Sequence, residues 1–369
     1  MSGETDIASL LAESSASFLS RRHRVARQRE MSAHAQGYDP ALWAEMAELG
    51  WLGLRLNEDL GGLGLGLADA APLVSAFGSA LLPEPFITCG LMPGVVLDGA
   101  ELGPRRAGLA RQLASGSRRL GLAWQERIGH LDHRAPATTL ERRDSAWILA
   151  GAKVLAPAAD ILIVSARGPD GLTLAAIDAA GLPSDRTALA DGGVALSLRL
   201  EAVPVDPDAV LASGGRAEAL LGAAIAEGTI AAAIFLEAIA SEALARTAAF
   251  LRQRVQFDQP LAHFQALRHR IVDLLLATEL SRSSWRNALR AHGTHPGEAA
   301  AEIGAAKARA SDAALVVTRA AVQMHGAMGY TEESEIGLFL KAALRWAPFL
   351  GGADAHRRRV LAGLTEQAA

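Results

Sequence analysis

The chain has 369 residues, a formal net charge of -4 and a pI near 6.2. This length allows two or three domains, each with a core of its own. The slightly acidic balance excludes a general nucleic-acid binder, because such proteins need a net basic face to displace counterions. Half of the residues are hydrophobic but only 5% are aromatic, which favours closely packed helices over a large aromatic core.

Cysteine usage and the apolar segments bear on the compartment. Cys89 is the only cysteine, which excludes an intramolecular disulfide and fits a reducing cytoplasm. The first residues lack the basic start and apolar block of a signal peptide. The most apolar stretch is interrupted by glutamates such as Glu227 and Glu237, so it predicts a buried helix instead of a membrane span. We therefore expect a cytoplasmic protein with no membrane partner and no metal site.

The N-terminal third predicts short helices joined by glycine-rich turns. Asp39 and Pro40 form a helix cap and first turn, and Gly50 can end that helix. From about Leu120 to Val205 the pattern changes to short alternating or β-branched runs separated by Gly, Pro and Asp. Such runs are typical of an antiparallel β-domain.

Long helical patterns fill the rest of the chain and predict a four-helix bundle. They cover residues 216–256, 261–291, 298–324 and 332–345. The fold class is therefore mostly α with a central β-domain. The predicted domains are an N-terminal α-helical domain (1–118), a middle β-domain (119–210) and a C-terminal four-helix bundle (211–369).

Two motifs in the predicted bundle have the chemistry of a dinucleotide site. In RVQFDQPLAHFQ, Arg254 offers a charge-assisted fork to phosphate oxygens, Phe257 can cover a ring, and Gln265 suits a neutral edge. Arg and Gln on helix surfaces are more commonly only solvated. The residue types of this motif therefore support a dinucleotide ligand.

The second motif is QMHGAMG, residues 323–329. Gln323 is a neutral donor and acceptor, while Gly326 and Gly329 allow the backbone to approach a ligand closely. A Gly-x-x-Gly pattern also commonly just ends a helix.

These motifs, the LWAEMAELGWLGLRLNEDLGGLGLG segment and the hairpin pattern SAWILAGAKVLAPAADILIVSAR resemble the acyl-CoA dehydrogenase family over nearly the whole chain. The resemblance implies FAD as cofactor, an acyl-CoA substrate and an electron-transfer flavoprotein as acceptor. It also implies that Arg254, Phe257, Gln265, Gln323, Gly326 and Gly329 reach the FAD of a neighbouring subunit. A dimer or a dimer of dimers would follow.

The flavin end departs from the family pattern at three places. Gln125 and Leu131 replace the threonine and serine of the family's Thr-Glu-Pro-x-x-Gly-Ser-Asp segment, although Glu126 and Asp132 keep its spacing. In the hairpin, the family's Trp-Ile-Thr becomes Leu155, Ala156 and Pro157. The third departure is the catalytic base.

Leu350 stands where the family commonly has its glutamate base, and a leucine cannot take a proton. Some family branches place the glutamate on the first bundle helix, and Glu227 lies one residue from that position. An ordinary helix glutamate facing solvent is the alternative for Glu227. Asp354 and His356 are further titratable groups near Leu350, but both suit a polar helix start.

The expected function is FAD-dependent α,β-dehydrogenation of an acyl-CoA thioester. FLGGADAH resembles the ending of small subunits in heteromeric bacterial acyl-CoA dehydrogenases, so the partner would be a larger acyl-CoA dehydrogenase subunit in a heterotetramer, or a second copy in a homo-oligomer. The alternative is a non-catalytic assembly subunit that completes a partner dehydrogenase's FAD site. A flavin monooxygenase or nitroalkane-oxidising relative of the same fold is a third hypothesis.

Overall fold

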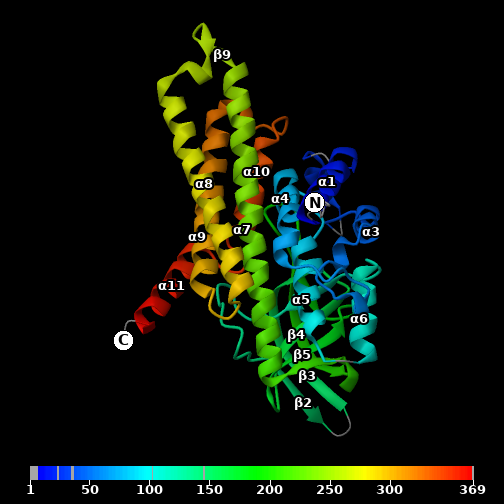
Figure 1. Ribbon diagram of the computed structural model, residues 1–369. Coiled ribbons are helices and arrows are strands. Elements are labelled where there is room, and N and C mark those ends of the chain that lie inside the picture. Colours follow the sequence, from blue (N-terminus) through cyan, green and yellow to red (C-terminus); the bar gives the residue numbers. More distant parts are fainter. Residues whose placement is uncertain (1–6, 23–24, 35–36, 102, 144–145, 368–369) are drawn as a thin grey trace, which may run out of the picture. The chain divides into compact units, whose positions relative to one another are not determined.

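A computed structural model describes residues 7–22, 25–34, 37–101, 103–143 and 146–367. The chain divides into two compact units. Unit 1 contains Met1–Ser32, Ala68–Leu82 and Thr229–Ala369, and unit 2 contains Ala33–Leu67 and Pro83–Gly228. Along the chain, helices precede a sheet and long helices follow it (Figure 1). This order confirms the predicted fold class, while the exact domain boundaries stay a prediction.

The helices with most or all of their residues in unit 1 include the predicted bundle. They are α1 (Ile7–Arg22), α2 (Arg27–Ala33), α4 (Leu67–Ala80), α7 (Gly214–Gln253), α8 (Gln265–Thr294), α9 (Ala300–Met324), α10 (Ile336–Trp346) and α11 (Ala353–Gln367). Residues 214–228 of α7 belong to unit 2. A glycine lets two helices approach closely here, because a Cβ on Gly78 of α4 would lie 2.7 Å from the carbonyl oxygen of Phe235 in α7. Small residues therefore set the helix spacing in unit 1.

A buried carboxylate ties α7 to α8. Glu237 is 2% exposed and accepts hydrogen bonds from Ser241 Oγ, Arg282 Nη2 and Trp285 Nε1. Both carboxylate oxygens are thus satisfied, as burial of a charge requires. The longest apolar helix, α7, is the one described helix with the length and composition to cross a membrane, and 67% of its apolar window is buried inside the protein. It is a core helix here.

The helices of unit 2 are short. They are α3 (Pro40–Glu48), the 3₁₀ turns η1 (Trp51–Gly53) and η2 (Glu58–Leu60), the π-turn η3 (Ile87–Leu91), α5 (Met92–Gly99) and α6 (Pro104–Ala114). As predicted, Asp39 caps α3 by accepting a hydrogen bond from the Ala41 amide, and Gly50 follows the helix in the left-handed region at φ 77°. The glycine-rich turn after η2 needs Gly62, since a Cβ there would meet the Leu56 carbonyl at 2.1 Å.

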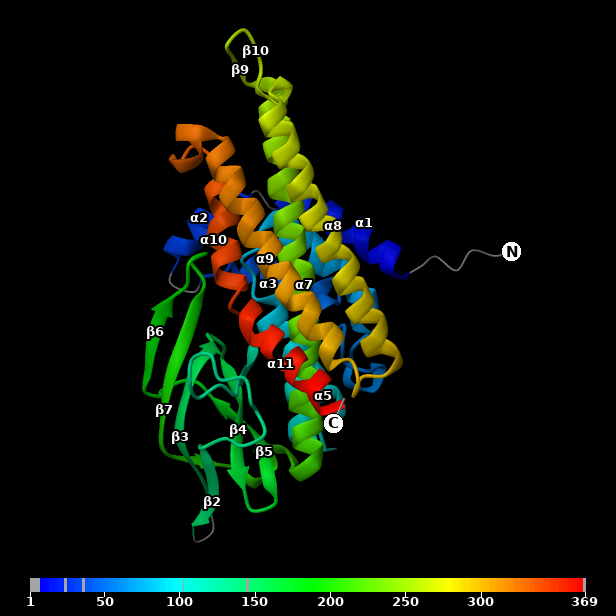
Figure 2. The same cartoon turned by 90° about the vertical axis from the view of Figure 1, so that its left-hand side faces the viewer.

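Eight strands of unit 2 form one sheet in the order β6-β7-β3-β2-β4-β5-β8, with β1 paired to β4 (Figure 2). The strands are β1 (Leu120–Ala123), β2 (Thr139–Arg143), β3 (Ala146–Pro157), β4 (Ile161–Gly168), β5 (Gly171–Asp178), β6 (Ser184–Ala188), β7 (Val194–Val205) and β8 (Val210–Ser213). Most pairings are antiparallel, but β1 and β2 each run parallel to β4. The segment that follows the parallel strand β1 lies beside β3, where the Val154 amide donates to the Gln125 carbonyl at 2.8 Å.

Candidate functional site

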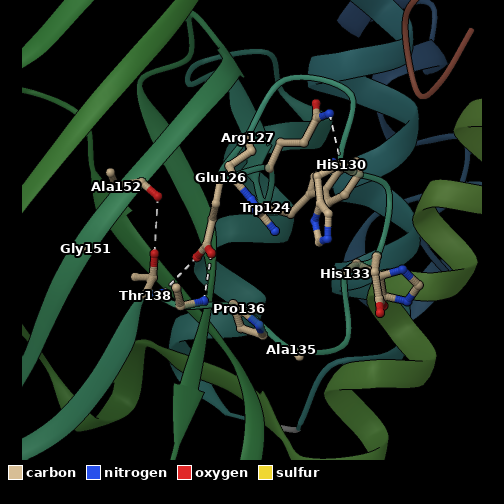
Figure 3. Close-up of a pocket in the computed structure, with 13 residues that line it drawn as sticks. Trp124, Glu126, Arg127, His130, His133, Ala135, Pro136, Thr138, Gly151 and Ala152 are labelled. Carbon is tan, nitrogen blue, oxygen red and sulfur yellow. Dashed lines mark hydrogen bonds between the residues drawn. The ribbon is translucent and has the colours of Figure 1, made fainter.

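The segment after β1 folds as a loop over a cavity within unit 2. The cavity has a volume of about 320 Å³ and is lined by loop residues between Trp124 and Thr138 and by Gly151 and Ala152 of β3. Acidic and basic side chains both line it, among them Glu126 and Arg127, together with His130 and His133 (Figure 3). The loop therefore occupies the place where the resemblance locates the flavin-contacting residues.

An ion pair fixes both ends of this loop. Glu126 accepts hydrogen bonds from the amides of Ala137 and Thr138 at 2.7 and 2.8 Å and from Lys153 Nζ at 2.8 Å. Lys153 is 0% exposed and also lies 3.2 Å from Ser165 Oγ. The Glu126 carboxylate thus joins the start of the loop to its end, and Lys153 of β3 anchors that carboxylate to the sheet.

Both members of this pair are charged at neutral pH. Burial raises the pKa of the Glu126 carboxyl, but hydrogen bonds from Lys153, Thr138 and two amides outweigh burial and lower this pKa to about 2. Burial is the dominant influence on Lys153 and lowers its pKa to about 8, against the opposing effect of Glu126. The two shifts leave a wide pH window in which the carboxylate and ammonium coexist.

The loop's polar groups are engaged within unit 2. Gln125 donates from Nε2 to the His130 carbonyl at 3.4 Å, and Thr138 donates from Oγ1 to the Ala152 carbonyl at 3.3 Å. At the hairpin, Leu155 is 42% exposed with φ 54° and has no polar side-chain atom, and Pro157 has no amide hydrogen. Gln125 and Thr138 are thus already hydrogen-bonded, and Leu155 and Pro157 offer no side-chain donor, so these four residues do not fit an isoalloxazine ring in the family's manner.

The first dinucleotide motif lies at the exposed tip between α7 and α8 (Figure 1). Strands β9 (Val255–Gln256) and β10 (Gln259–Pro260) form a two-residue hairpin whose turn residues, Phe257 and Asp258, have φ 54° and 61°. Left-handed backbone at two consecutive non-glycine residues is strained. It holds Phe257 outward, with 83% of its surface exposed. Arg254 and Gln265 are exposed beside it in the sequence.

The second motif lies at the end of α9, where η6 (Gly326–Tyr330) begins. Gln323 and Gly326 are exposed, and Gly326 has φ 63°. Gly329 is buried, and a Cβ there would meet the Val322 carbonyl at 2.3 Å. The glycine at 329 is thus already required by packing of this turn on its own helix. The exposed groups of both motifs fit a dinucleotide tail, since arginine and amide side chains with solvent access can pair with phosphate and adenosine edges.

The turn between α10 and α11 carries Leu350. Leu350 is 6% exposed and left-handed at φ 54°. Lys307 of α9 donates from Nζ to the carbonyls of Ala347 and Gly351 at 2.7 and 3.1 Å and to Ser311 Oγ at 3.0 Å. The turn is therefore clamped through its carbonyl oxygens from an adjacent helix. Burial lowers the pKa of Lys307 to about 7, an effect to which Arg345 adds.

The two alternative bases near Leu350 are differently placed. His356 is 4% exposed, with Nε2 3.0 Å from the Leu350 carbonyl, and burial lowers its pKa to about 4. Its imidazole is thus neutral at pH 7 and engaged with the turn. Asp354 is on the first turn of α11, where Arg357 Nη1 donates to its Oδ1 at 3.0 Å. Both side chains have structural partners of their own.

Glu227 is buried on α7 and paired with Arg55, both within unit 2. Arg55 donates from Nε to Oε2 at 2.9 Å and from Nη2 to Oε1 at 2.7 Å, and its Nη1 donates to the Leu65 carbonyl at 2.6 Å. The side chains are 19% and 8% exposed. One guanidinium thus engages both carboxylate oxygens and ties the turn after η1 to α7. To accept a substrate proton, Glu227 would have to share an oxygen with Arg55.

Sequence reasoning missed Arg55 and Lys307. Arg55 is 172 positions from Glu227, and no local pattern connects residues so far apart. Lys307 did carry a signal, because it interrupts the small apolar residues of AAKARASDAA on the face that becomes buried.

Comparison with known proteins agrees with this architecture. Residues 5–96 match the family model "Acyl-CoA dehydrogenase, N-terminal domain" and residues 219–364 match "Acyl-CoA dehydrogenase, C-terminal domain". The acyl-CoA dehydrogenase IpdE2 of Mycolicibacterium smegmatis is 30% identical over 330 residues, covering 88% of each chain. The chain belongs to the acyl-CoA dehydrogenase family, whose members are FAD-dependent oxidoreductases of lipid metabolism.

Two solved structures are similar over almost the full length. A chain of the Tcur3481-Tcur3483 steroid ACAD has 30% identity and a TM-score of 0.86, with 98% of both chains covered. A chain of the ChsE4-ChsE5 complex from Mycobacterium tuberculosis has 24% identity and a TM-score of 0.89, covering 99% of this chain and 98% of that one. The second likeness concerns the fold alone.

Proposed function

We propose that this chain is a small subunit of a heteromeric FAD-dependent acyl-CoA dehydrogenase and completes the FAD site of a larger partner subunit. The observation that carries the proposal is the contrast between two halves of one cofactor site. Arg254, Phe257 and Gln265 are exposed and can reach outward, whereas Gln125, Glu126 and Thr138 of the flavin segment are already hydrogen-bonded within unit 2. The similar chain of the Tcur3481-Tcur3483 steroid ACAD, whose name joins two components, adds support.

In this proposal the reaction is α,β-dehydrogenation of an acyl-CoA thioester. When bound, FAD supplies an acceptor for the β-hydride, and a carboxylate takes the α-proton. The partner supplies that carboxylate and the flavin cradle. This chain contributes a cation to the pyrophosphate through Arg254, a ring cover through Phe257, and neutral partners through Gln265 and Gln323. Gly326 and Gly329 shape the turn beside Gln323. An electron-transfer flavoprotein is the proposed acceptor.

A second candidate is a complete site in a homo-oligomer with Glu227 as the base. The burial of Glu227 favours it, because a buried carboxylate on α7 is the kind of group that a proton abstraction needs. The engagement of both oxygens by Arg55 weighs against it. An assembly subunit without any role in flavin binding is the third possibility and would leave the exposed motifs unexplained.

Flavin absorbance and native mass separate these candidates. The chain purified alone should be colourless, and it should carry flavin only when co-expressed with a larger dehydrogenase-like partner. A flavin-loaded, active homo-oligomer of this chain alone would contradict the heteromeric proposal. In that case Glu227→Gln should lower turnover by roughly 10² to 10⁴-fold, the usual contribution of a general base.

A substitution in this chain then tests whether its residues contribute to flavin binding in the complex. Arg254→Gln should strip flavin from the co-expressed complex although the partner is unchanged, because one phosphate-pairing fork is lost. Arg252→Gln, an exposed arginine two residues away on α7, is the matched control and should keep the flavin. Equal flavin content in both variants would leave the chain with an assembly role only.

A further inference from the structure

The cavity of unit 2 is lined by two carboxylates whose charges are already balanced. Lys153 Nζ lies 2.8 Å from Oε1 of Glu126. Asp132 accepts hydrogen bonds from the Arg134 guanidinium, at 3.0 Å from Nε and 3.4 Å from Nη2, and these bonds are the main reason why the pKa of Asp132 is lowered to about 2. Each carboxylate therefore has a cation of its own, so the other basic side chains of the cavity have no carboxylate to balance them there.

Arg127 and His130 lie at the two ends of one tight turn in the cavity wall. The His130 amide donates to the Arg127 carbonyl at 3.2 Å, and Gly129 between them has φ 78°, as the third residue of a type II turn requires. Such a turn keeps the Cα atoms of its first and last residues within about 7 Å of each other. The two basic side chains therefore start close together, and Figure 3 shows the His130 ring pointing into the space that the loop encloses.

Neither of these two side chains takes part in folding contacts. Both are exposed, and among the described residues the Arg127 guanidinium and the His130 ring have no hydrogen-bond or ion-pair partner. The family's Thr-Glu-Pro-x-x-Gly-Ser-Asp segment has proline and glycine at these two places, whereas this chain has arginine and histidine. Two residues without side-chain donors are thus replaced by two residues that have them, and both line the cavity.

Apolar groups form another part of the cavity wall. Trp124 is 8% exposed and Pro136 is buried, and both line the cavity. Its volume of about 320 Å³ is at the lower end of the range for ligand pockets, about 300–1,000 Å³, and so suits a small molecule. A guanidinium pairs with the two oxygens of a carboxylate, and apolar walls favour an apolar body behind that carboxylate. The lining therefore matches a ligand with one anionic end and one apolar end.

We propose that this cavity binds a small carboxylate with a short apolar body, held at its carboxylate oxygens by Arg127 and His130. The site is separate from the two dinucleotide motifs, because no residue of RVQFDQPLAHFQ or QMHGAMG lines it. The proposal goes beyond the proposed function, since its ligand is not a flavin and the residues that bind it belong to this chain alone. An inorganic oxyanion such as phosphate is the competing ligand, and the test separates the two.

Three probes test the chemistry of the ligand in the chain purified alone, by isothermal titration calorimetry. Butanoate and butanamide have nearly the same shape and differ in charge, whereas inorganic phosphate has charge without an apolar body. Butanoate should bind at least about 10-fold more tightly than either of the others, because it alone offers both a charged hydrogen-bond acceptor and an apolar body. Butanamide or phosphate binding as tightly as butanoate would overturn the proposal. So would a folded chain that binds no butanoate at about 10 mM.

Substitutions then test where butanoate binds. Arg127→Gln should weaken butanoate binding at least about 10-fold, and His130→Asn roughly threefold to 10-fold, because each variant loses one donor to the carboxylate. Arg142→Gln is the matched control, at an exposed arginine of β2 that does not line the cavity, and it should bind within about twofold of the unchanged chain.

Two outcomes of these substitutions are decisive. An Arg127→Gln chain that is folded by circular dichroism and binds butanoate like the unchanged chain would refute the site. Equal weakening in Arg127→Gln and Arg142→Gln would refute it too, because the effect would then be one of net charge. Neither result bears on flavin retention in the Arg254→Gln complex, so failure of this site and failure of the proposed function are distinguishable.

Discussion

The ion pair between Arg55 and Glu227 allows a quantitative prediction about the stability contributed by Glu227, the candidate catalytic base on α7. Arg55→Met removes the guanidinium that engages both carboxylate oxygens of Glu227, which is 6% exposed. Removing one partner of a buried ion pair costs about 3–5 kcal/mol, whereas exposed pairs contribute about 0.2–1 kcal/mol. Because the Arg55 side chain is 19% exposed, we expect a loss of about 2–4 kcal/mol.

Glu227→Gln should cost about 2–3 kcal/mol, since the guanidinium keeps its bond to the Leu65 carbonyl and some contact with water. The double variant Arg55→Met/Glu227→Gln should lose less than the sum, with a coupling of at least about 1 kcal/mol. Urea unfolding followed by circular dichroism measures all three. Glu242→Gln breaks an i,i+4 pair with Arg246 on the same helix and should cost only about 0.3–0.5 kcal/mol.

If the losses of the two single variants simply add in the double variant, the stabilising ion pair between Arg55 and Glu227 is refuted, because independent side chains show coupling below about 0.5 kcal/mol. A Glu227→Gln chain as stable as the unchanged one would refute it too. In that case the ion pair contributes nothing to folding, and the carboxylate would be retained for another reason, with proton abstraction the first to examine.

Three further predictions concern stability. Lys307→Met should lower the free energy of unfolding by at least about 2 kcal/mol, because the buried carbonyls of Ala347 and Gly351 lose their donor. Lys341→Met, on the exposed side of α10, is the control and should change it by less than about 0.5 kcal/mol. Similar shifts in melting temperature for the two variants would contradict a stabilising role for the Lys307 hydrogen bonds. Gly62→Ala should prevent normal folding through its backbone clash, while Gly103→Ala, with no atom within 4 Å of the added Cβ, should fold normally, as circular dichroism would show. The folded-state pKa of Glu126, about 2, lies below its ordinary 4.5, so its stabilising effect is present above pH 4.5 and is lost as the pH falls towards 2. In Glu126→Gln, the free energy of unfolding measured in urea should therefore depend less on pH between 4.5 and 2. An unchanged pH dependence in this variant would mean that other groups cause the acid destabilisation.

Local sequence determined the order of elements in this protein. The helix start at Asp39 and Pro40, the alternating runs between Leu120 and Val205, and the long helical patterns after them were all correctly predicted. Each depends on capping, side-chain periodicity or helix propensity, which act over a few residues. The glycine-rich turn at Gly62 also followed from the sequence, although its reason is a backbone contact.

The sequence also identified which groups are suited to a dinucleotide, but not where they point. Only the tertiary structure showed that Phe257 is held outward by a strained hairpin turn and that Gly329 is required by packing against its own helix. It likewise showed that the loop around Glu126 closes on Lys153. Exposure and hydrogen bonding depend on the neighbours that folding supplies.

The environment of the candidate bases was decided entirely by long-range contacts. From the sequence, Glu227 was a titratable residue close to a position where some family branches have the catalytic base, and Leu350 was a residue that cannot accept a proton. Folding brought Arg55 to Glu227 and Lys307 to the turn that contains Leu350. A carboxylate's role depends on which charge lies within hydrogen-bond reach, and no pattern of neighbouring residues encodes that contact.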